Sequence, residues 1–361
     1  MASIRKKGNT WSVRISWQEN GKQRQREKSG FKTKAEAKKY GIEQEQLLNK
    51  GIRIDKPDIP FVKYFRDWYK TYKSNKVTQI TLNRYKVTAS VLEKFFGDTL
   101  IKSINRTDYQ KFINWYGANH APHSVNRTNS LIRNCVKSAI LDDYIQKDFT
   151  AEITIVSNKD KMLDVEYLSV DEIKTLLNKT ISKLDTRYTS RYMIVTAILT
   201  GMRIGEISAL TWNDIDFKNQ TIDINKSWDI RTGVKPTKTK GSMRTIAVPS
   251  ELLDILSQLK INNTKEVFKC NLGTIPTGTA VNKTLHAILK DCGLEKKNFH
   301  FHSLRHAHVA YLLYKNIDIY AISKRLGHEN ITTTLNIYAY LMDEHTRRED
   351  EVIKKKISEL F

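Results

Sequence analysis

The first fifty residues alternate apolar and polar side chains, a pattern typical of a half-buried β-sheet. The alternation predicts strands over residues 4–6, 11–17 and 23–29, and an Asn20-Gly21 turn can join the last two strands as a hairpin. Thr33 can cap a helix that runs from residue 34 to about residue 48. The pattern therefore predicts a small three-stranded sheet followed by one helix.

The last of these strands carries basic side chains at alternate positions, namely Lys22, Arg24, Arg26 and Lys28. Because side chains alternate between the two faces of a strand, all four should point the same way. A ribbon with one basic face can enter the major groove of DNA. A solvated strand face that binds nothing explains the same spacing equally well.

A second pattern begins after the proline-containing stretch over residues 51–60, which is expected to be a linker. Apolar residues then recur at helical spacing as far as about residue 147. They predict helices that begin at Phe61 and that span residues 82–96, 108–115 with Thr107 as the cap, and 124–145. An all-α bundle of about four helices is expected here.

The third pattern mixes helices with short strands. Ser169 and Glu172 form a capping box before helices over about residues 170–184 and 188–200, and a short helix runs to residue 210. Residues 221–227 and 244–248 are expected to be strands joined by a lysine-rich turn, and helices resume at residue 250. We therefore predict a multidomain α+β protein with domains over residues 1–55, 56–160 and 161–361, the last mostly α-helical with a small antiparallel sheet.

Charge adds a candidate partner to this picture. The chain has 361 residues, and its 61 Lys and Arg against 39 Asp and Glu give a net charge of +22. The excess is spread over all three predicted domains, which fits contact with a long polyanion at several places. Three widely spaced cysteines, no signal peptide and no apolar run long enough for a bilayer predict a cytosolic protein without a membrane partner.

Four short motifs in the third domain carry the candidate chemistry. They are Thr-Gly-Met-Arg-Ile-Gly-Glu at 200–206, a basic segment at 236–244, His-Ser-Leu-Arg-His at 302–306, and Leu-Gly-His at 326–328 followed by a segment that ends in Tyr338. His302 and His306 have the spacing of a helical zinc site, but Ser303 stands where a metalloprotease motif requires glutamate. There is no Walker-type loop and no carboxylate cluster spaced for two metals. We therefore expect no metal and no cofactor.

What remains is arginine, lysine, histidine and tyrosine, a set that can act on a phosphodiester without a metal. Two arginine forks can hold the nonbridging oxygens, a tyrosine hydroxyl can attack the phosphorus, and lysine or histidine can move protons. With these motifs in this order, the chain resembles a tyrosine recombinase of the phage and conjugative-transposon integrase type. The resemblance covers essentially the whole chain. It implies an arm-type DNA-binding domain, a SAM-like core-binding helical domain and a catalytic domain.

The resemblance implies six catalytic residues, which are Arg203, Lys238, His302, Arg305, His328 and Tyr338. The two arginines would hold the scissile phosphate, Lys238 would protonate the departing 5′-hydroxyl, and the two histidines would bind phosphate and transfer protons. Tyr338 would be the nucleophile. Glu206 would orient the site without reacting.

Neighbouring residues compete for some of these roles. Lys240 is the rival of Lys238, although the family lysine directly precedes a threonine, as Lys238 does. Tyr340 lies close to Tyr338 but lacks the family spacing from His328. His306 and His308 are expected to pack or to form local hydrogen bonds.

The implied reaction gives a 3′-phosphotyrosine and a free 5′-hydroxyl, and it conserves the bond energy without a nucleotide. Four protomers would exchange strands between two double-stranded DNA sites, with core and arm sequences, through a Holliday junction. They would integrate a mobile element in the bacterial cytoplasm, at the nucleoid, and excise it with an excisionase or directionality factor. An apolar stripe near the C-terminus could pack on its own domain or on a neighbouring protomer.

Three alternatives stay open at this point. A resolvase of chromosome dimers resembles residues 61–361 but generally lacks the first domain. A type IB topoisomerase shares the tyrosine chemistry but has a different motif order. A catalytically inactive DNA-binding relative would have lost active residues, whereas all six positions are filled here.

Overall fold

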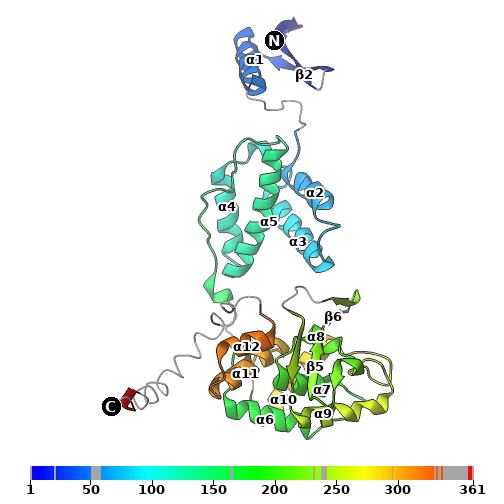
Figure 1. Cartoon of the computed structure of the whole chain (residues 1–361). Coiled ribbons are helices and arrows are strands. Elements are labelled where there is room, and N and C mark those ends of the chain that lie inside the picture. Colours follow the sequence, from blue (N-terminus) through cyan, green and yellow to red (C-terminus); the bar gives the residue numbers. More distant parts are fainter. Residues whose placement is uncertain are drawn as a thin grey trace. The chain divides into compact units, whose positions relative to one another are not determined.

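The structure is a computed structural model that describes residues 2–19, 22–49, 58–162, 166–230, 232–236, 242–294, 296–328, 331, 335 and 357–359. The chain divides into two compact units, residues 1–163 and 164–361, and each is described by itself. Figure 1 shows their elements along the chain.

The N-terminal part of the first unit is an antiparallel sheet with one helix against it (Figure 1). Its strands are β1 (Ala2–Lys7), β2 (Thr10–Glu19) and β3 (Lys22–Phe31), in the order β1-β2-β3, and the helix is α1 (Lys34–Asn49). The Thr33 hydroxyl accepts a hydrogen bond from the backbone N–H of Glu36 at 3.2 Å, so the predicted cap is confirmed. Val13, Ile15 and Ala37 form the buried core between sheet and helix.

The register of the sheet decides where the basic row of β3 lies. Arg26 stands opposite Ile15 and Lys28 opposite Val13, so these basic residues share the face whose apolar side chains pack on α1. The Lys28 ammonium lies 4.4 Å from the ring centroid of Tyr40 on that helix. The row therefore borders the core side of the sheet and does not form the open polar face that we expected. Its contact with DNA stays a prediction.

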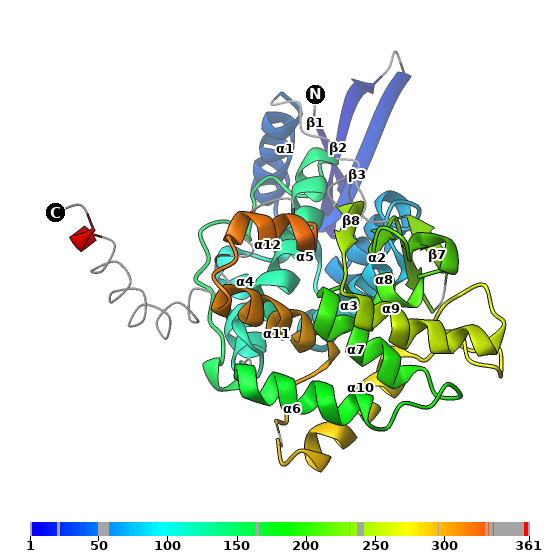
Figure 2. The same cartoon turned by 60° about the horizontal axis from the view of Figure 1, so that its bottom comes forward.

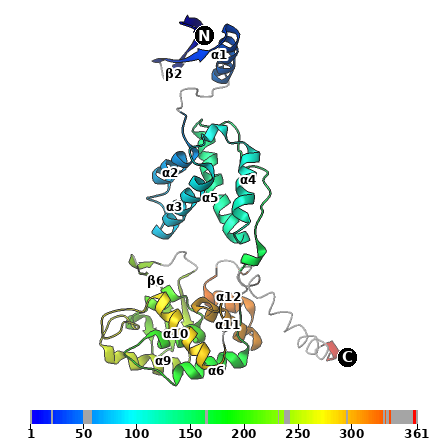
Figure 3. The ribbon, with the colours of Figure 1, turned by 180° about the vertical axis from the view of Figure 1, so that it is seen from behind.

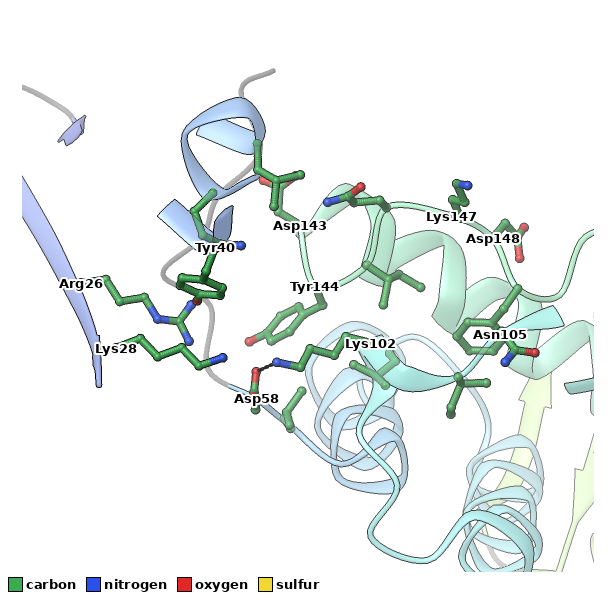
Figure 4. Close-up of a pocket in the computed structure, with 18 of the residues that line it drawn as sticks. Arg26, Lys28, Tyr40, Asp58, Lys102, Asn105, Asp143, Tyr144, Lys147 and Asp148 are labelled. Atoms are coloured by element: carbon green, nitrogen blue, oxygen red, sulfur yellow. Dashed lines mark hydrogen bonds and ion pairs between the residues drawn. The ribbon is translucent and has the colours of Figure 1, made fainter. Parts of the chain in front are cut away.

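Residues 58–162 hold an all-α bundle, as predicted (Figures 1 and 3). Its helices are α2 (Phe61–Tyr72), α3 (Gln79–Phe96), α4 (Arg106–Gly117) and α5 (Pro122–Leu141). Fully buried rings of Phe61, Phe65 and Phe112 fill the centre, and Trp68 donates to the Ser138 hydroxyl at 2.8 Å. Near the start of the bundle, Lys102 forms an exposed ion pair with Asp58 (Figure 4).

The cap of α4 differs from the sequence-based expectation. Asn105, and not Thr107, caps the helix, since its side chain accepts from Asp108 N at 3.0 Å and the Asp108 side chain accepts from Asn105 N at 3.2 Å. This reciprocal capping box satisfies two backbone donors at once and so fixes an earlier start.

The second unit is built around α7 (Ser190–Thr200), which is buried along nearly its whole length. Helices α6 (Val170–Ile181), α8 (Ile204–Ser208), α9 (Ser250–Ser257), α10 (Gly278–Asp291) and α11 (Phe301–Tyr314) pack on it (Figures 2 and 3). Helix α12 (Ile319–Leu326) lies against α11 and the strand β8 (Arg244–Ala247). The capping box of Ser169 with Glu172 is present as predicted.

The strands that the structure describes in this unit form two small sheets. One has the order β4-β5-β8, with β4 (Ile215–Asp216) and β5 (Thr221–Ile224), and the other is a hairpin of β6 (Lys226–Asp229) and β7 (Gly233–Pro236). Residues 221–227, expected as one strand, are thus divided between two sheets. The break falls at Asn225, whose side-chain amide donates to the carboxylates of Asp214 at 3.2 Å and Asp223 at 2.7 Å. The next residue, Lys226, binds the same buried Asp214 carboxylate at 2.5 Å.

No helix within the described part of the chain is both long and apolar enough to cross a bilayer.

Candidate active site

Arg203 lies at a sharp break between two helices. Helix α7 ends at Thr200, Gly201 takes a left-handed conformation with φ 67°, and Arg203 is the N-cap residue of α8. A Cβ atom on Gly201 would lie 2.8 Å from the ring of His308, so both the backbone angle and the space require glycine. The break turns the Arg203 side chain outward, and 38% of it is exposed.

Glu206 is buried between two arginines. Its Oε1 atom accepts from the guanidinium of Arg203 at 2.9 Å, and its Oε2 atom accepts from that of Arg244 at 2.9 Å. Burial raises the pKa of this carboxyl, but the hydrogen bonds and positive charge of Arg244 and Arg203 more than offset that effect and hold it below its usual value. One negative charge shared by two positive ones leaves a net positive charge at the exposed Arg203.

Arg305 reaches three segments from within the core. It lies on α11 with a relative exposure of 3%. Its guanidinium donates to the carbonyl oxygens of Gly201 and Leu326, both at 2.7 Å, and to Nε2 of His328 at 2.9 Å. One side chain thus joins the break before Arg203 to the end of α12.

Two histidines of the predicted set lie close to these arginines, and both are neutral near pH 7. Loss of surrounding water, with the charges of Arg305 and Arg203, lowers the pKa of His328 to about 4. His302 is exposed as a residue, yet the protein atoms around its ring, the neighbouring His306 and the charge of Arg305 lower its pKa to about 4 as well. Neutral imidazoles can donate a hydrogen bond to a phosphate oxygen or accept a proton from a nucleophile.

The structure therefore brings together Arg203, Glu206, His302, Arg305 and His328 from the predicted set. The other two residues, Lys238 and Tyr338, and their rivals Lys240 and Tyr340 lie outside the described residues. The hydrogen bonds of His308 are not the local ones that we expected but join it to distant segments: it donates to the carbonyl of Ile198 at 2.9 Å and accepts from Arg325 at 3.1 Å.

Two arginines of the site were not singled out from the sequence. Arg244 ends the basic motif at 236–244, and Arg325 directly precedes Leu326-Gly327-His328. The Arg244 side chain is buried, with 7% exposed, and Arg325 is half-buried, and both donate to acceptors that are remote in the chain. The position of these two arginines beside the motifs is the signal in the sequence that could have identified them.

The described residues contain no group of three or more His, Cys, Asp or Glu side chains arranged to hold a metal ion. The arginines and neutral histidines of the described site can bind an anionic phosphate and stabilise added negative charge.

Models of known protein families match three segments of the chain. Residues 166–345 match the phage integrase family, residues 3–46 match an arm DNA-binding domain, and residues 34–155 match a phage integrase SAM-like domain. An integrase of a Staphylococcus phage is 26% identical over 345 residues, which are 86% of this chain and 97% of that protein. The ICEBs1 integrase of Bacillus subtilis is 27% identical over 288 residues, which are 72% of this chain and 74% of that protein.

Solved structures show the same fold. The Tn1549 transposon integrase in complex with a circular intermediate DNA has a TM-score of 0.68 at 19% identity, over 82% of this chain and 99% of that one. A lambda integrase from a tetramer bound to a Holliday junction has a TM-score of 0.59 at 18% identity, over 92% of this chain and 96% of that one.

Proposed function

The chain belongs to the phage integrase family of tyrosine recombinases, and we propose that it cuts and rejoins DNA at specific sites to integrate a mobile element. The observation that carries the proposal is the junction built by Arg305, which joins the Arg203 break to His328. Two guanidinium groups and two neutral histidines meet there. This set suits a phosphodiester that gains negative charge as it becomes pentacoordinate.

The reaction follows from the chemistry of these groups. Arg203 and Arg305 hold the nonbridging oxygens, while the hydroxyl of Tyr338 attacks the phosphorus and gives its proton to the neutral imidazole of His302. The new phosphorus–oxygen bond is a 3′-phosphotyrosine, and the bond that breaks releases the 5′-oxygen, which takes a proton from Lys238. Because the phosphodiester energy is retained in the covalent bond, the partner strand's 5′-hydroxyl can reverse the step without a nucleotide.

We propose a tetramer as the acting form, with two duplexes joined through a Holliday junction. Support comes from the lambda integrase, whose structure is a tetramer bound to such a junction. An excisionase or directionality factor would bias the reaction toward excision, and the protein would act at the nucleoid of a bacterial cell. The proposed domains span residues 1–55 for arm sites, 56–160 for core sites and 161–361 for catalysis.

We assign contact with arm sites to the open face of the N-terminal sheet, which is the face that points away from α1. That face carries Arg5 opposite Ser12 and Arg14 opposite Glu27, on the side away from Val13 and Ile15. Helix α1 packs on the opposite face, so this face can lie in a major groove, whereas α1 hinders access to the Arg26 and Lys28 side. We therefore assign groove contact to the open face and backbone contact to the basic row.

A covalent-trapping experiment tests the function. The protein is incubated with nicked suicide duplexes that carry the junction sequences flanking its gene, and a protein–DNA adduct is sought on denaturing gels. Wild type and Tyr340→Phe should form the adduct, whereas Tyr338→Phe should not. An adduct with Tyr338→Phe would overturn the choice of nucleophile, and no adduct with wild type on any flanking junction would overturn the function.

A further inference from the structure

Arg325 joins three elements that meet behind the active site. It lies in the last turn of α12, and its guanidinium donates in three directions. Nε donates to Nε2 of His308 on α11 at 3.1 Å, and the terminal nitrogens donate to the carbonyls of Ala247 at the end of β8, at 2.9 Å, and Leu199 on α7, at 3.4 Å. All three acceptors are neutral.

His308 is held in one orientation by its two partners. Arginine has no acceptor, so Nε2 must carry the lone pair and Nδ1 the proton that is donated to the carbonyl of Ile198 at 2.9 Å. Burial and the charge of Arg325 lower the pKa of this histidine to about 3, which keeps it neutral at working pH. The ring also contacts Gly201, where any Cβ would lie 2.8 Å from it.

The backbone that Arg325 fixes is the same backbone that holds the catalytic arginine. The carbonyl of Arg325 accepts from Nε of Arg244 at 2.6 Å, and the next carbonyl, that of Leu326, accepts from Arg305 at 2.7 Å. Arg305 then reaches His328, two residues further along the chain. A shift of the last turn of α12 would therefore move acceptors of both arginines and the histidine together.

We propose that Arg325 and His308 are positioning residues for strand cleavage, holding the end of α12 so that Arg305 and His328 are aligned on the scissile phosphate. The inference rests on the proposed function and deepens it. Neither side chain needs to touch DNA. Each acts through a catalytic residue, and a misplacement of about 1 Å at such a site can cost on the order of 100-fold in rate.

The test separates alignment from folding. Adduct formation on a saturating suicide substrate is followed over time for Arg325→Lys, Arg325→Met and His308→Phe, with the exposed neighbour variant Lys324→Met as the matched control. Misalignment lowers the rate constant of the reaction, whereas a partly unfolded population lowers only its amplitude. We expect the rate constant to fall by about 100-fold in the three variants, with DNA affinity unchanged and Lys324→Met at the wild-type rate.

A conservative variant and a modified substrate sharpen the outcome. His308→Gln can still accept from Arg325 and donate to Ile198, so it should keep most of the wild-type rate. In the modified substrate, sulfur replaces the bridging 5′-oxygen at the scissile phosphate and leaves as a thiolate, which needs no proton donor. This substrate should therefore restore the cleavage rate of Lys238→Ala but not that of Arg325→Lys.

Wild-type rate constants in the Arg325 variants, or lower amplitudes alone, would overturn the positioning role while leaving the function intact. Rescue of Arg325→Lys by the sulfur substrate would likewise overturn it, because it would assign the residue to proton transfer. An inactive wild type would instead overturn the proposed function.

Discussion

The guanidinium of Arg305 donates a hydrogen bond to Nε2 of His328 across 2.9 Å. Since arginine can only donate, this bond requires His328 to be neutral, with its remaining proton on Nδ1. An N–H of this kind can donate to a phosphate oxygen, whereas the ring, with its lone pair bound to Arg305, cannot take the proton of the nucleophile. The pair thus fixes the tautomer of the histidine as well as the place of its ring.

Buried neutral histidines should make the catalytic domain sensitive to acid. The pKa of His308 falls from 6.5 to about 3 on folding, so the unfolded chain binds the proton more strongly and stability is lost as pH falls below 6.5. For His308 alone the loss from pH 6.5 to pH 5 is roughly 1.5 kcal/mol. This loss of stability can be measured in the full chain by amide hydrogen exchange in α11, after the exchange rates are corrected for the pH dependence of intrinsic exchange.

His308→Gln is the control for that measurement, because it removes this titration and leaves those of His302, His306 and His328. Its loss of protection over the same pH interval should be smaller than that of wild type. An equal loss would show that His308 does not contribute.

Gly201→Ala should destabilise the active-site break by about 2–3 kcal/mol, through both its positive φ and the contact with His308. Gly233→Ala is the matched control, since its φ is 73° but no atom lies within 4 Å of the place where its Cβ would stand. The control should lose about 1 kcal/mol. Urea unfolding of both variants gives the difference, and equal losses would show that the contact with His308 is relieved at little cost.

Glu206→Gln should leave Arg203 and Arg244 facing each other without their shared carboxylate. Removing one partner of a buried ion pair typically costs about 3–5 kcal/mol. The thermal midpoint and the rate of adduct formation should both fall. Adding Arg244→Met removes the repulsion and should recover part of the stability, and a double variant less stable than Glu206→Gln alone would contradict this account.

Lys226→Met should destabilise the base of the β6–β7 hairpin by about 3 kcal/mol, because it leaves the buried Asp214 carboxylate without its cation. Lys102→Met breaks an exposed pair with Asp58 and should cost at most about 1 kcal/mol. Chemical denaturation compares the two variants. Similar costs would mean that the Asp214 pair is no stronger than a surface pair.

Arg5→Ala on the open face of the N-terminal sheet should reduce discrimination between arm-site and unrelated DNA. Arg26→Ala on the other face should weaken binding to both DNAs alike. It should also reduce, by about one unit, the slope of the logarithm of the binding constant against the logarithm of the salt concentration, because about one counterion fewer is released. Titrations at several salt concentrations measure both effects. A specific loss with Arg26→Ala and none with Arg5→Ala would reverse the assignment of the two faces.

Much of the fold was predictable because it depends on local chemistry. Thr33 and Ser169 cap helices as their sequence contexts predict, and the apolar spacing identified the helical bundle. The α4 cap was misplaced by two residues because Asn105 and Thr107 are both capable caps, and only the reciprocal bond with Asp108 favours the first.

The sequence by itself determined the candidate chemistry, since residue types and their order along the chain specify which groups can clamp, attack and protonate. It also placed Lys22, Arg24, Arg26 and Lys28 on one face, because strand alternation is local. Only the tertiary structure decided which face that was, and only it gave Glu206 its second arginine and Arg325 its three acceptors. These contacts join residues that are far apart in the chain, and their partners are set by packing and register, which no local pattern encodes.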